Sequence, residues 1–275
     1  MGRGLLSASL CVVSWAFPGT PYPPVSESTH SMASTRLFVA IDNPSVEAAS
    51  AVALKLQSLS GRGLGIKLGL EFFGACGPSG IKQVHDAAPN VPIFLDLKFH
   101  DIPNTVAGVV RSVAPLGPQM FTIHSSGGRA MMEAAVKAAT DAAAESGGTK
   151  PLLIAVTVLT SLDNDDLASV GQTPPAEDQV VRLAKLAQSC GMDGVVCSPK
   201  EIAAIRAACG SSFVLVVPGI RPAGAAVGDQ KRVTTPGEAI TAGASCLVVG
   251  RPITQAEDQV AAATAILEEI SAAAK

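Results

Sequence analysis

Residues 93–105 read Ile-Phe-Leu-Asp-Leu-Lys-Phe-His-Asp-Ile-Pro-Asn-Thr, a short apolar run that carries charges near its end. A continuous run of this kind is typical of a strand whose two faces are both buried. Similar runs recur along the chain. The predicted strands are Leu37–Asp42, Gly65–Gly69, Ile93–Lys98, Met120–His124, Leu152–Thr157, Gly194–Cys197, Phe213–Pro218 and Cys246–Gly250.

Ala-rich helix patterns alternate with these runs. They cover Val46–Leu59, Glu71–Ala88, Thr105–Ala114, Arg129–Glu145, Glu177–Cys190, Pro199–Cys209, Pro236–Ala242 and Thr254–Ala273. Strand and helix units repeated in this way over about 240 residues predict a single (β/α)8 TIM barrel. A doubly wound sheet is the alternative, but Asp42-Asn43-Pro44 does not resemble the G-x-G-x-x-G turn of that fold. We therefore expect residues 35–275 to form one barrel domain.

The composition excludes several classes of protein. The 275 residues include 20 Lys and Arg and 23 Asp and Glu, a formal net charge of −3, whereas a nucleic-acid binder is usually strongly basic. With 48% hydrophobic and 16% charged residues, the chain is not disordered over most of its length. The cysteines form no C-x-x-C pair, and we expect buried free thiols in a reducing cytoplasm rather than disulfides or zinc ligands. They are Cys11, Cys76, Cys190, Cys197, Cys209 and Cys246.

Residues 1–34 do not fit the barrel pattern. Leu5–Phe17 is mostly apolar, but serines interrupt it, no A-x-A cleavage site follows, and it is too short to span a membrane. We interpret residues 1–34 as a disordered extension or a mis-called start, with a targeting sequence as the alternative. We expect no association with a membrane.

Charged residues lie at the predicted strand ends, which is where barrel enzymes carry their chemistry. Asp42 ends the first strand, Lys67 lies in the second, and Asp96 and Lys98 lie in the third with Asp101 close behind. Residues i and i+2 of a strand share a face, so Asp96 and Lys98 should point together. With Lys67 and Asp101 they would form an alternating network that keeps Lys98 protonated, able to act as an acid on a carbanion. A structural ion-pair cluster is the alternative.

Two further segments suggest a phosphate site. The seventh strand leads into Pro-Gly-Ile-Arg221, and the eighth leads into Gly250-Arg251-Pro. Barrels commonly bind phosphate in the loops after these strands. Gly250 would let a backbone amide approach the anion, Arg221 and Arg251 would chelate it, and Gln230 would donate a further hydrogen bond. Surface arginines are the alternative.

Metal binding finds no support in the sequence. There are four histidines and no H-x-H or H-E-x-x-H motif, so we expect no metal site. His124 ends a predicted strand, and we expect it to be a packed or hydrogen-bonded structural histidine. The acidic run Asp163–Asp166 we interpret as a solvated helix start.

The stretch 93–105 resembles the signature of the orotidine 5′-phosphate decarboxylase family, in its bacterial type. The resemblance extends from Leu37 to about Leu267. The D-x-K-x-x-D pattern is shared with sugar-phosphate enzymes on the same barrel, whereas the D-I-P-N-T, P-G-I-R and G-D-Q segments are specific to the decarboxylases. Residues 1–34 have no counterpart in the family pattern.

This resemblance implies cofactor-independent decarboxylation of orotidine 5′-monophosphate (OMP) to UMP, the last step of de novo pyrimidine biosynthesis. It also implies a homodimer with the site at the subunit interface. Lys98 would protonate the C6 carbanion, Asp96 would lie beside the scissile carboxylate, and Lys67 would hold Asp96 and touch the ribose. Asp101 and Thr105 would reach the neighbouring subunit's site.

The remaining positions matched to the family concern substrate binding. Asp42 would bind a ribose hydroxyl, and Thr160, with Ser161 near it, would meet the pyrimidine edge. The phosphate would be taken by Arg221, Gln230, Gly250 and Arg251.

Two other functions stay open from the sequence. A metal-assisted sugar-phosphate decarboxylase or aldolase of the same barrel superfamily would need a carboxylate set that binds magnesium. A catalytically silent nucleotide-binding barrel would be expected to lack Lys98 or Asp101, and this chain has both.

Overall fold

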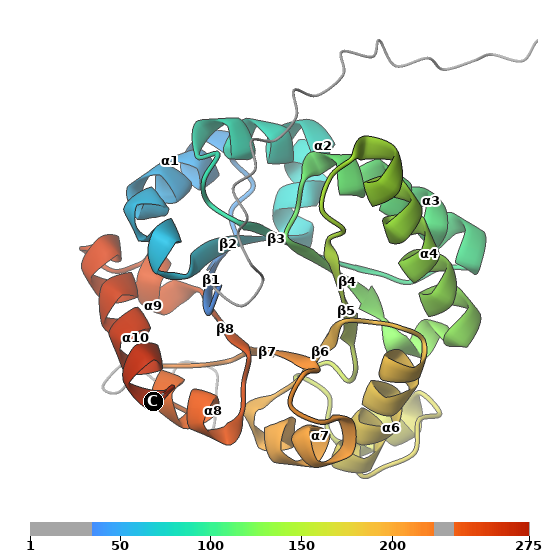
Figure 1. Cartoon of the computed structure of the whole chain (residues 1–275). Coiled ribbons are helices and arrows are strands. Elements are labelled where there is room, and N and C mark those ends of the chain that lie inside the picture. The colour runs from blue at the N-terminus through green and yellow to red at the C-terminus, as the bar shows by residue number, and fades with distance from the viewer. Residues whose placement is uncertain (1–34, 223–233, 275) are drawn as a thin grey trace, which may run out of the picture.

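The computed structural model describes residues 35–222 and 234–274. Its parallel strands close into a barrel in chain order, and β8 pairs with β1 (Figure 1). This arrangement confirms the predicted TIM barrel. The strands are β1 Leu37–Ile41, β2 Leu64–Gly69, β3 Ile93–Phe99, β4 Met120–His124, β5 Leu152–Val156, β6 Gly194–Val196, β7 Val214–Pro218 and β8 Cys246–Val249.

The helices form the outer ring around the strands (Figure 1). They are α1 Val46–Leu56, α2 Leu70–Ala87, α3 Pro103–Val113, α4 Arg129–Ser146, α5 Asn164–Ser169, α6 Ala176–Ser189, α7 Ile202–Cys209, α8 Pro236–Ala242, α9 Arg251–Thr254 and α10 Gln259–Ala273. Short 3-10 turns cover Gln57–Arg62, Ala114–Leu116, Ser125–Gly127 and Pro199–Glu201. Helix starts follow local capping chemistry: the Ser45 hydroxyl accepts from the Ala48 amide, and Thr235 forms a capping box with Glu238.

The last predicted helix is wrong at its N-terminal end. The chain forms the short α9 from Arg251 and then leaves the helical conformation before α10 begins. Asp258 causes the restart, because its side chain accepts from the Ala261 amide and so acts as an N-cap. The acidic run after β5 does start a helix, with the Asp163 side chain accepting from the Asp165 and Asp166 amides of α5.

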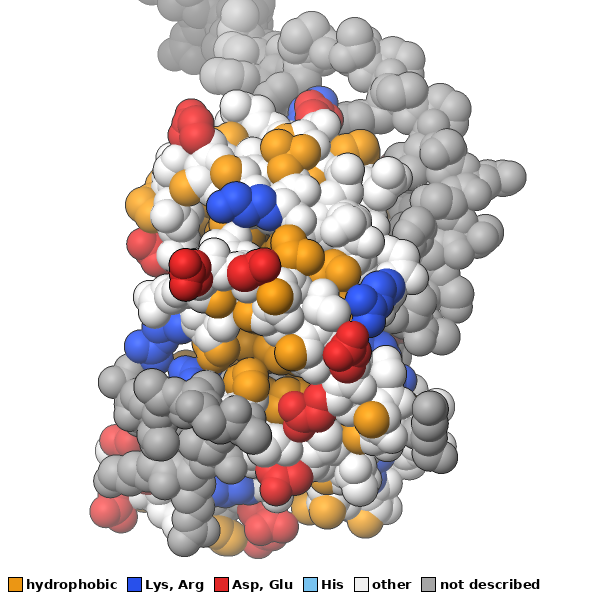
Figure 2. Space-filling view, turned by 90° about the vertical axis from the view of Figure 1, so that its left-hand side faces the viewer, with side chains coloured by type: hydrophobic (Ala, Val, Ile, Leu, Met, Phe, Trp, Pro, Cys, Tyr) orange, Lys and Arg blue, Asp and Glu red, His pale blue; other side chains and the backbone are white. Residues whose placement is uncertain are grey.

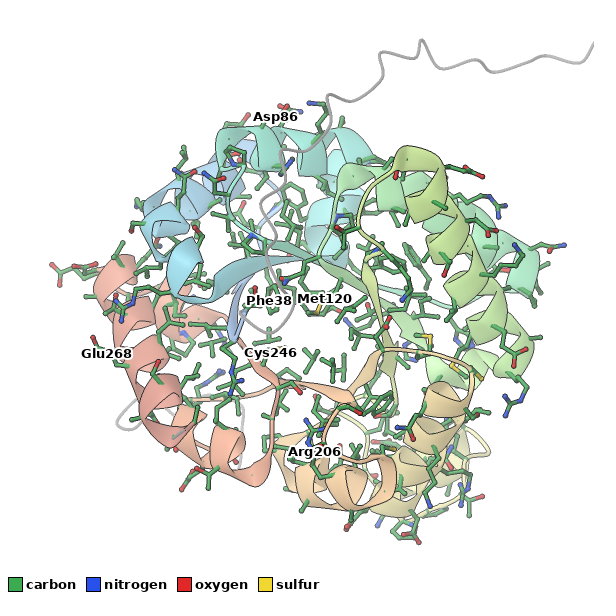
Figure 3. All side chains as sticks on the ribbon, in the orientation of Figure 1. Phe38, Asp86, Met120, Arg206, Cys246 and Glu268 are labelled. Carbon is green, nitrogen blue, oxygen red and sulfur yellow. The ribbon has the colours of Figure 1, made fainter. Side chains whose placement is uncertain are left out.

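Both faces of the strands are buried, as the continuous apolar runs predict. One face packs against the helices, and the other fills the barrel interior. The interior layer includes Phe38, Met120 and Cys246, which Figure 3 labels inside the ring of strands. The ring of Phe38 meets that of Phe94 edge to face, with centroids 5.5 Å apart. This layer fills the interior beneath the strand ends that carry the charged residues.

The surface carries charges of both signs. Figure 2 views the side of the molecule on which α1 and α10 lie, and there acidic and basic side chains are interspersed among hydrophobic ones. This distribution agrees with the small net charge of −3.

Arg206 on α7 forms hydrogen bonds with both loops that lead into β7 and β8 (Figure 3). Its guanidinium donates to the backbone carbonyls of Gly210 at 2.9 Å, Phe213 at 2.5 Å and Gly243 at 2.8 Å. It also donates to the Ser245 hydroxyl at 2.9 Å. Arg206 therefore anchors the N-terminal ends of β7 and β8, the two strands that lead to Arg221 and Arg251.

We expect Arg206→Ala to lower the free energy of unfolding by about 2–4 kcal/mol, because several carbonyls lose a charged donor at once. Urea denaturation measures the change. Arg62→Ala is the control, since Arg62 forms only a solvent-exposed ion pair with Glu268 at 3.7 Å and should cost about 1 kcal/mol or less. Equal midpoints for the two variants would show that Arg206 is not an anchor.

Candidate active site

A cavity of about 360 Å³ opens at the carboxyl ends of the strands. Its wall combines apolar residues of the barrel interior, such as Phe94 and Val248, with polar residues from the strand ends. The structure thus brings together most of the predicted site residues. Those that line the cavity are Asp42, Lys67, Asp96, Lys98, Thr160, Arg221, Gly250 and Arg251.

Four charged side chains form an alternating array on one wall. The Lys98 ammonium lies 2.8 Å from Oδ1 of Asp96. The Lys67 ammonium lies 3.5 Å from Oδ2 of Asp96 and 3.3 Å from Oδ1 of Asp42. Each ammonium therefore contacts a carboxylate, and Asp96 lies between the two lysines.

The sequence placed Asp101 in this network, but within the described chain the second carboxylate beside Lys67 is that of Asp42. Asp101 lies beyond the end of β3, is exposed, and accepts a hydrogen bond from the Ile102 amide at 2.6 Å just before α3. This hydrogen bond is local, and the Lys98 ammonium pairs with Asp96 rather than with Asp101.

The array keeps Asp96 ionised although its side chain is only 15% exposed. Burial by itself would raise the pKa of this carboxyl. The charges of Lys67 and Lys98 and hydrogen bonds from Lys98 and Thr122 outweigh burial and hold the pKa below its ordinary value of 3.8. At neutral pH, Asp96 therefore faces the cavity as an anion between two cations.

This lowered pKa predicts how stability depends on pH. Ionised Asp96 stabilises the fold above its ordinary pKa, and this contribution is lost as pH falls through the lowered value. We expect the free energy of unfolding to fall more steeply between about pH 5 and about pH 3 in the wild type than in Asp96→Asn. Urea denaturation at each pH measures both slopes, and parallel slopes would contradict the prediction.

Strand β3 is irregular where it carries the array. Leu95 pairs with Phe121 of β4, and Phe99 pairs with Ile123, so the three residues from Asp96 to Lys98 lie opposite Thr122 alone. Lys98 has a φ of 49°, in the left-handed region that non-glycine residues rarely adopt. Strain of this kind is often found at functional sites, where the surrounding structure maintains it.

The hydroxyl of Thr122, which the sequence analysis did not single out, contacts the array directly. It accepts from the Lys98 backbone amide at 2.8 Å and donates to Oδ1 of Asp96 at 3.1 Å. A threonine within an apolar strand gives no signal in sequence, because threonine is common in strands for its shape alone.

A second feature near the array is a pair of histidines. The rings of His100 and His124 lie with centroids 5.3 Å apart. Burial lowers the pKa of His124, and the neighbouring His100 and Lys98 lower it further. The neutral form is therefore favoured, which suits the packed histidine predicted for position 124.

The part of the cavity wall at the ends of β7 and β8 carries the predicted anion site. Arg221 is only 9% exposed, and its Nη1 donates to a neutral partner, the Ile220 carbonyl, at 3.2 Å. A buried guanidinium beside a cavity is suited to bind an anion there. Gly219, with a φ of 80°, turns the chain between β7 and Arg221, and Gly250 directly precedes Arg251 at the start of α9. Gln230 lies outside the residues that the structure describes.

Two predicted residues do not line this cavity. Asp101 and Thr105 are both exposed, the latter in the first turn of α3. Exposed apolar side chains lie at the same end of the barrel: Ile102, after β3, is 67% exposed, and Leu70, directly after β2, is 58% exposed. Thr160 does line the cavity, in the loop after β5, while the adjacent Ser161 is exposed.

Within residues 35–222 and 234–274, no group of three or more His, Cys, Asp or Glu side chains is arranged to hold a metal ion. In the same part of the chain, no helix has the length and apolar character needed to cross a membrane. The cysteines described there are free thiols, and all but Cys76 are buried.

Comparison with known proteins agrees with the geometry. Residues 35–266 match the family model described as orotidine 5′-phosphate decarboxylase / HUMPS family. Orotidine 5′-phosphate decarboxylase of Moorella thermoacetica is 49% identical over 247 residues, which cover 90% of this chain and 96% of the relative. The enzyme of the same name from Paramagnetospirillum magneticum is 53% identical over 234 residues, or 85% and 97% of the two chains.

A solved structure shares the fold. The crystal structure of orotidine 5′-phosphate decarboxylase from Lactobacillus acidophilus superposes with a TM-score of 0.76 at 38% identity, covering 86% of this chain and 99% of that one. Since the family model spans most of the barrel and both sequence relatives match nearly over their full length, the chain belongs to the orotidine 5′-phosphate decarboxylase / HUMPS family.

Proposed function

We propose that this protein decarboxylates orotidine 5′-monophosphate to UMP without a cofactor, as the last step of de novo pyrimidine biosynthesis, and that residues 35–275 form its single catalytic domain. The observation that carries the proposal is the alternating array of Asp42, Lys67, Asp96 and Lys98 on the wall of the cavity. The names of relatives about half identical to this chain support the same reaction.

The reaction needs stabilisation of a carbanion. The bond between C6 and the carboxylate breaks, CO2 leaves, and the electron pair remains on C6, where the ring delocalises it poorly. Fixed charges must then stabilise the anion. In our proposal, the Lys98 ammonium does so and transfers a proton to C6, giving UMP. The Lys98 side chain is 29% exposed, so solvent can return the proton before the next turnover.

Asp96 and Lys67 would have supporting roles. The ionised carboxylate of Asp96 would lie beside the carboxylate that is lost, and the repulsion between them would fall as CO2 departs. Lys67 would hold Asp96 from the other side and, with Asp42, bind the ribose hydroxyls. These roles use the contacts at 3.5 and 3.3 Å that connect Lys67 to its two carboxylate neighbours.

The rest of the cavity would bind the two ends of the nucleotide. Thr160, with Ser161 near it, would meet the edge of the pyrimidine. The phosphate would be bound by Arg221, Arg251 and the backbone amide at Gly250, with Gln230 as a further hydrogen-bond donor. The buried guanidinium of Arg221 supports this assignment, because a phosphate would supply the anionic partner that such a group needs.

We also propose that the protein works as a homodimer in which Asp101 and Thr105 reach the neighbouring subunit's site. Both residues are exposed and absent from the cavity wall of their own chain. Between them lies Ile102, which is 67% exposed, and such an apolar side chain is suited to be covered by a second copy.

A hybrid dimer tests the shared site. Lys98→Ala and Asp101→Ala homodimers should both be nearly inactive. A purified heterodimer of the two variants would have one site with both residues intact, so we expect about half of the wild-type activity. If Asp101 instead served its own subunit, both sites of the hybrid would be defective, and an inactive hybrid would contradict the proposal. Two different affinity tags separate the hybrid from the homodimers.

We propose a cytoplasmic location for the enzyme. The described cysteines are free thiols, and burial raises the pKa of the Cys246 thiol to about 12, which keeps it unreactive. Free thiols of this kind fit a reducing compartment.

One assay tests the proposed reaction against its rival. Purified protein is mixed with OMP and excess EDTA, and the loss of OMP absorbance is followed together with UMP formation. We expect full turnover with the chelator present. A metal-assisted sugar-phosphate decarboxylase or aldolase would leave OMP unchanged, and its activity on a sugar phosphate would stop when EDTA is added.

A further inference from the structure

Thr122 lies on β4 beside the charged array, and its side chain is completely buried. A buried hydroxyl must be hydrogen-bonded, and this one is bonded twice. It donates its single proton to Oδ1 of Asp96 and accepts the Lys98 backbone amide on a lone pair. It is not among the residues of the cavity wall, so it contacts two site residues from behind.

The position of Thr122 in the sheet explains these contacts. It is the single β4 residue opposite the three-residue bulge from Asp96 to Lys98. In a regular ladder the Lys98 amide would donate to a backbone carbonyl of the neighbouring strand. Here the Thr122 hydroxyl oxygen accepts the hydrogen bond from that amide at 2.8 Å. Lys98 adopts a left-handed conformation with a φ of 49°. Such a conformation persists only where the surrounding structure holds it.

The same hydroxyl also fixes the Asp96 carboxylate. Oδ1 receives the Thr122 hydroxyl at 3.1 Å and the Lys98 ammonium at 2.8 Å, while Oδ2 faces Lys67 at 3.5 Å. Both oxygens are therefore engaged, and the carboxylate cannot rotate without losing a contact. Thr122 thus connects the backbone of the lysine to the side chain of its ion-pair partner.

We infer that Thr122 is a positioning residue for decarboxylation: its hydroxyl holds the Lys98 backbone and the Asp96 carboxylate so that the Lys98 ammonium is aimed at the reacting carbon. The inference rests on the proposed function, since it assigns the proton transfer to Lys98. Thr122 acts through these two neighbours.

Two substitutions isolate the hydroxyl. Thr122→Val removes it at nearly constant volume, and Thr122→Ser retains it. Because a hydrogen bond to a charged group is lost, we expect Thr122→Val to lower kcat for OMP about ten- to hundred-fold while KM changes by less than about two-fold. Thr122→Ser should keep kcat within about three-fold of the wild type.

Thr157→Val is the matched control. Thr157 follows β5 and is 3% exposed, but its hydroxyl donates to the backbone carbonyl of Val196 at 3.0 Å and contacts no charged side chain of the array. Thr157→Val also removes a buried threonine hydroxyl, but it should keep kcat within about two-fold of the wild type because that hydroxyl is bonded to Val196 and not to the array.

The pH dependence of kcat distinguishes the loss of this hydrogen bond from a general packing defect, which would not shift the profile. Asp96 is faced by Lys67 from β2, Lys98 from β3 and His124 from the end of β4, with Asp42 behind Lys67. All four remain in Thr122→Val, while a hydrogen bond that favours ionised Asp96 is lost. The acidic limb of the kcat profile should therefore move to higher pH in Thr122→Val and stay in place in Thr157→Val.

The outcomes separate this inference from the proposed function. If the wild-type protein does not decarboxylate OMP, the proposed function is wrong, and the positioning role of Thr122 falls with it. An active wild type whose Thr122→Val variant keeps its kcat and pH profile, or changes only in KM, overturns the positioning role alone. Equal losses of kcat in the serine variant or the Thr157 control would overturn it as well. If Thr122→Val does not fold, Thr122→Cys carries the comparison, because its thiol is a poor donor and acceptor.

Discussion

Lys98→Ala is expected to lower kcat for OMP by at least about four powers of ten, which corresponds to about 5.5 kcal/mol of transition-state stabilisation. The substitution removes both the proposed proton donor and the cation nearest to Asp96, at 2.8 Å. The carbanion would then form beside an anionic carboxylate, with Lys67 as the remaining cation of the array. Binding should also weaken, because the substrate carboxylate would face Asp96 with less compensation.

The chain offers a close control for this experiment. Lys150, just before β5, also pairs with an aspartate, Asp193, at 2.9 Å, and its side chain is 29% exposed, the same fraction as that of Lys98. It lies at the opposite end of the strands from the cavity. Lys150→Ala should keep kcat within about two-fold, because Lys150 is remote from the cavity. The loss of this partly exposed ion pair should also have little effect on the stability of the fold. Single-turnover measurements with both variants compare the chemical step directly. More than about one per cent of wild-type kcat in Lys98→Ala would rule out Lys98 as the essential acid.

The barrel could be predicted from the sequence because its strands are buried on both faces. Runs such as Leu37–Asp42 and Met120–His124 differ from the observed strands by a residue or less. Charges such as Lys67 and Asp96 within these runs stand out, since an ionised group in a buried strand needs a partner. Continuous apolar runs and the cost of burying charge therefore located the charged part of the cavity wall, whereas Thr160 was predicted only from the family resemblance.

The inner details of the site could not be predicted in the same way. The rule that residues i and i+2 share a face correctly predicted that Asp96 and Lys98 meet, but it could not predict that β3 is bulged from Asp96 to Lys98. The role of Thr122 depends on this bulge and on the pairing of β3 with β4, which no local pattern specifies. The contact of Lys67 with Asp42 rather than with Asp101 could not be predicted for a similar reason. The direction of a loop after its strand depends on local hydrogen bonds, such as the one from the Ile102 amide to Asp101.

Arg251→Ala is expected to lower kcat/KM for OMP by about three powers of ten, or about 4 kcal/mol, because a charge-assisted contact to phosphate is lost. In the proposed complex, Arg251 and Arg221 bind the phosphate from the loops after β8 and β7, while Lys98 lies on β3. A contact so remote from C6 affects the rate only through binding energy that orients the substrate and excludes water. Steady-state kinetics with OMP measures the loss, and Arg62→Ala, an arginine in an exposed ion pair with Glu268, serves as the control.

Orotidine, the nucleoside without the phosphate, makes the test of Arg251 specific. The wild type should turn it over far more slowly than OMP, since the remote binding energy is absent. Arg251→Ala should then leave kcat/KM for orotidine within about two-fold of the wild-type value, because the lost guanidinium has no phosphate to bind. A variant equally impaired with both substrates would show that Arg251 shapes the cavity in general. Unchanged turnover of OMP would place the phosphate elsewhere, and the buried guanidinium of Arg221 would then need another anionic partner.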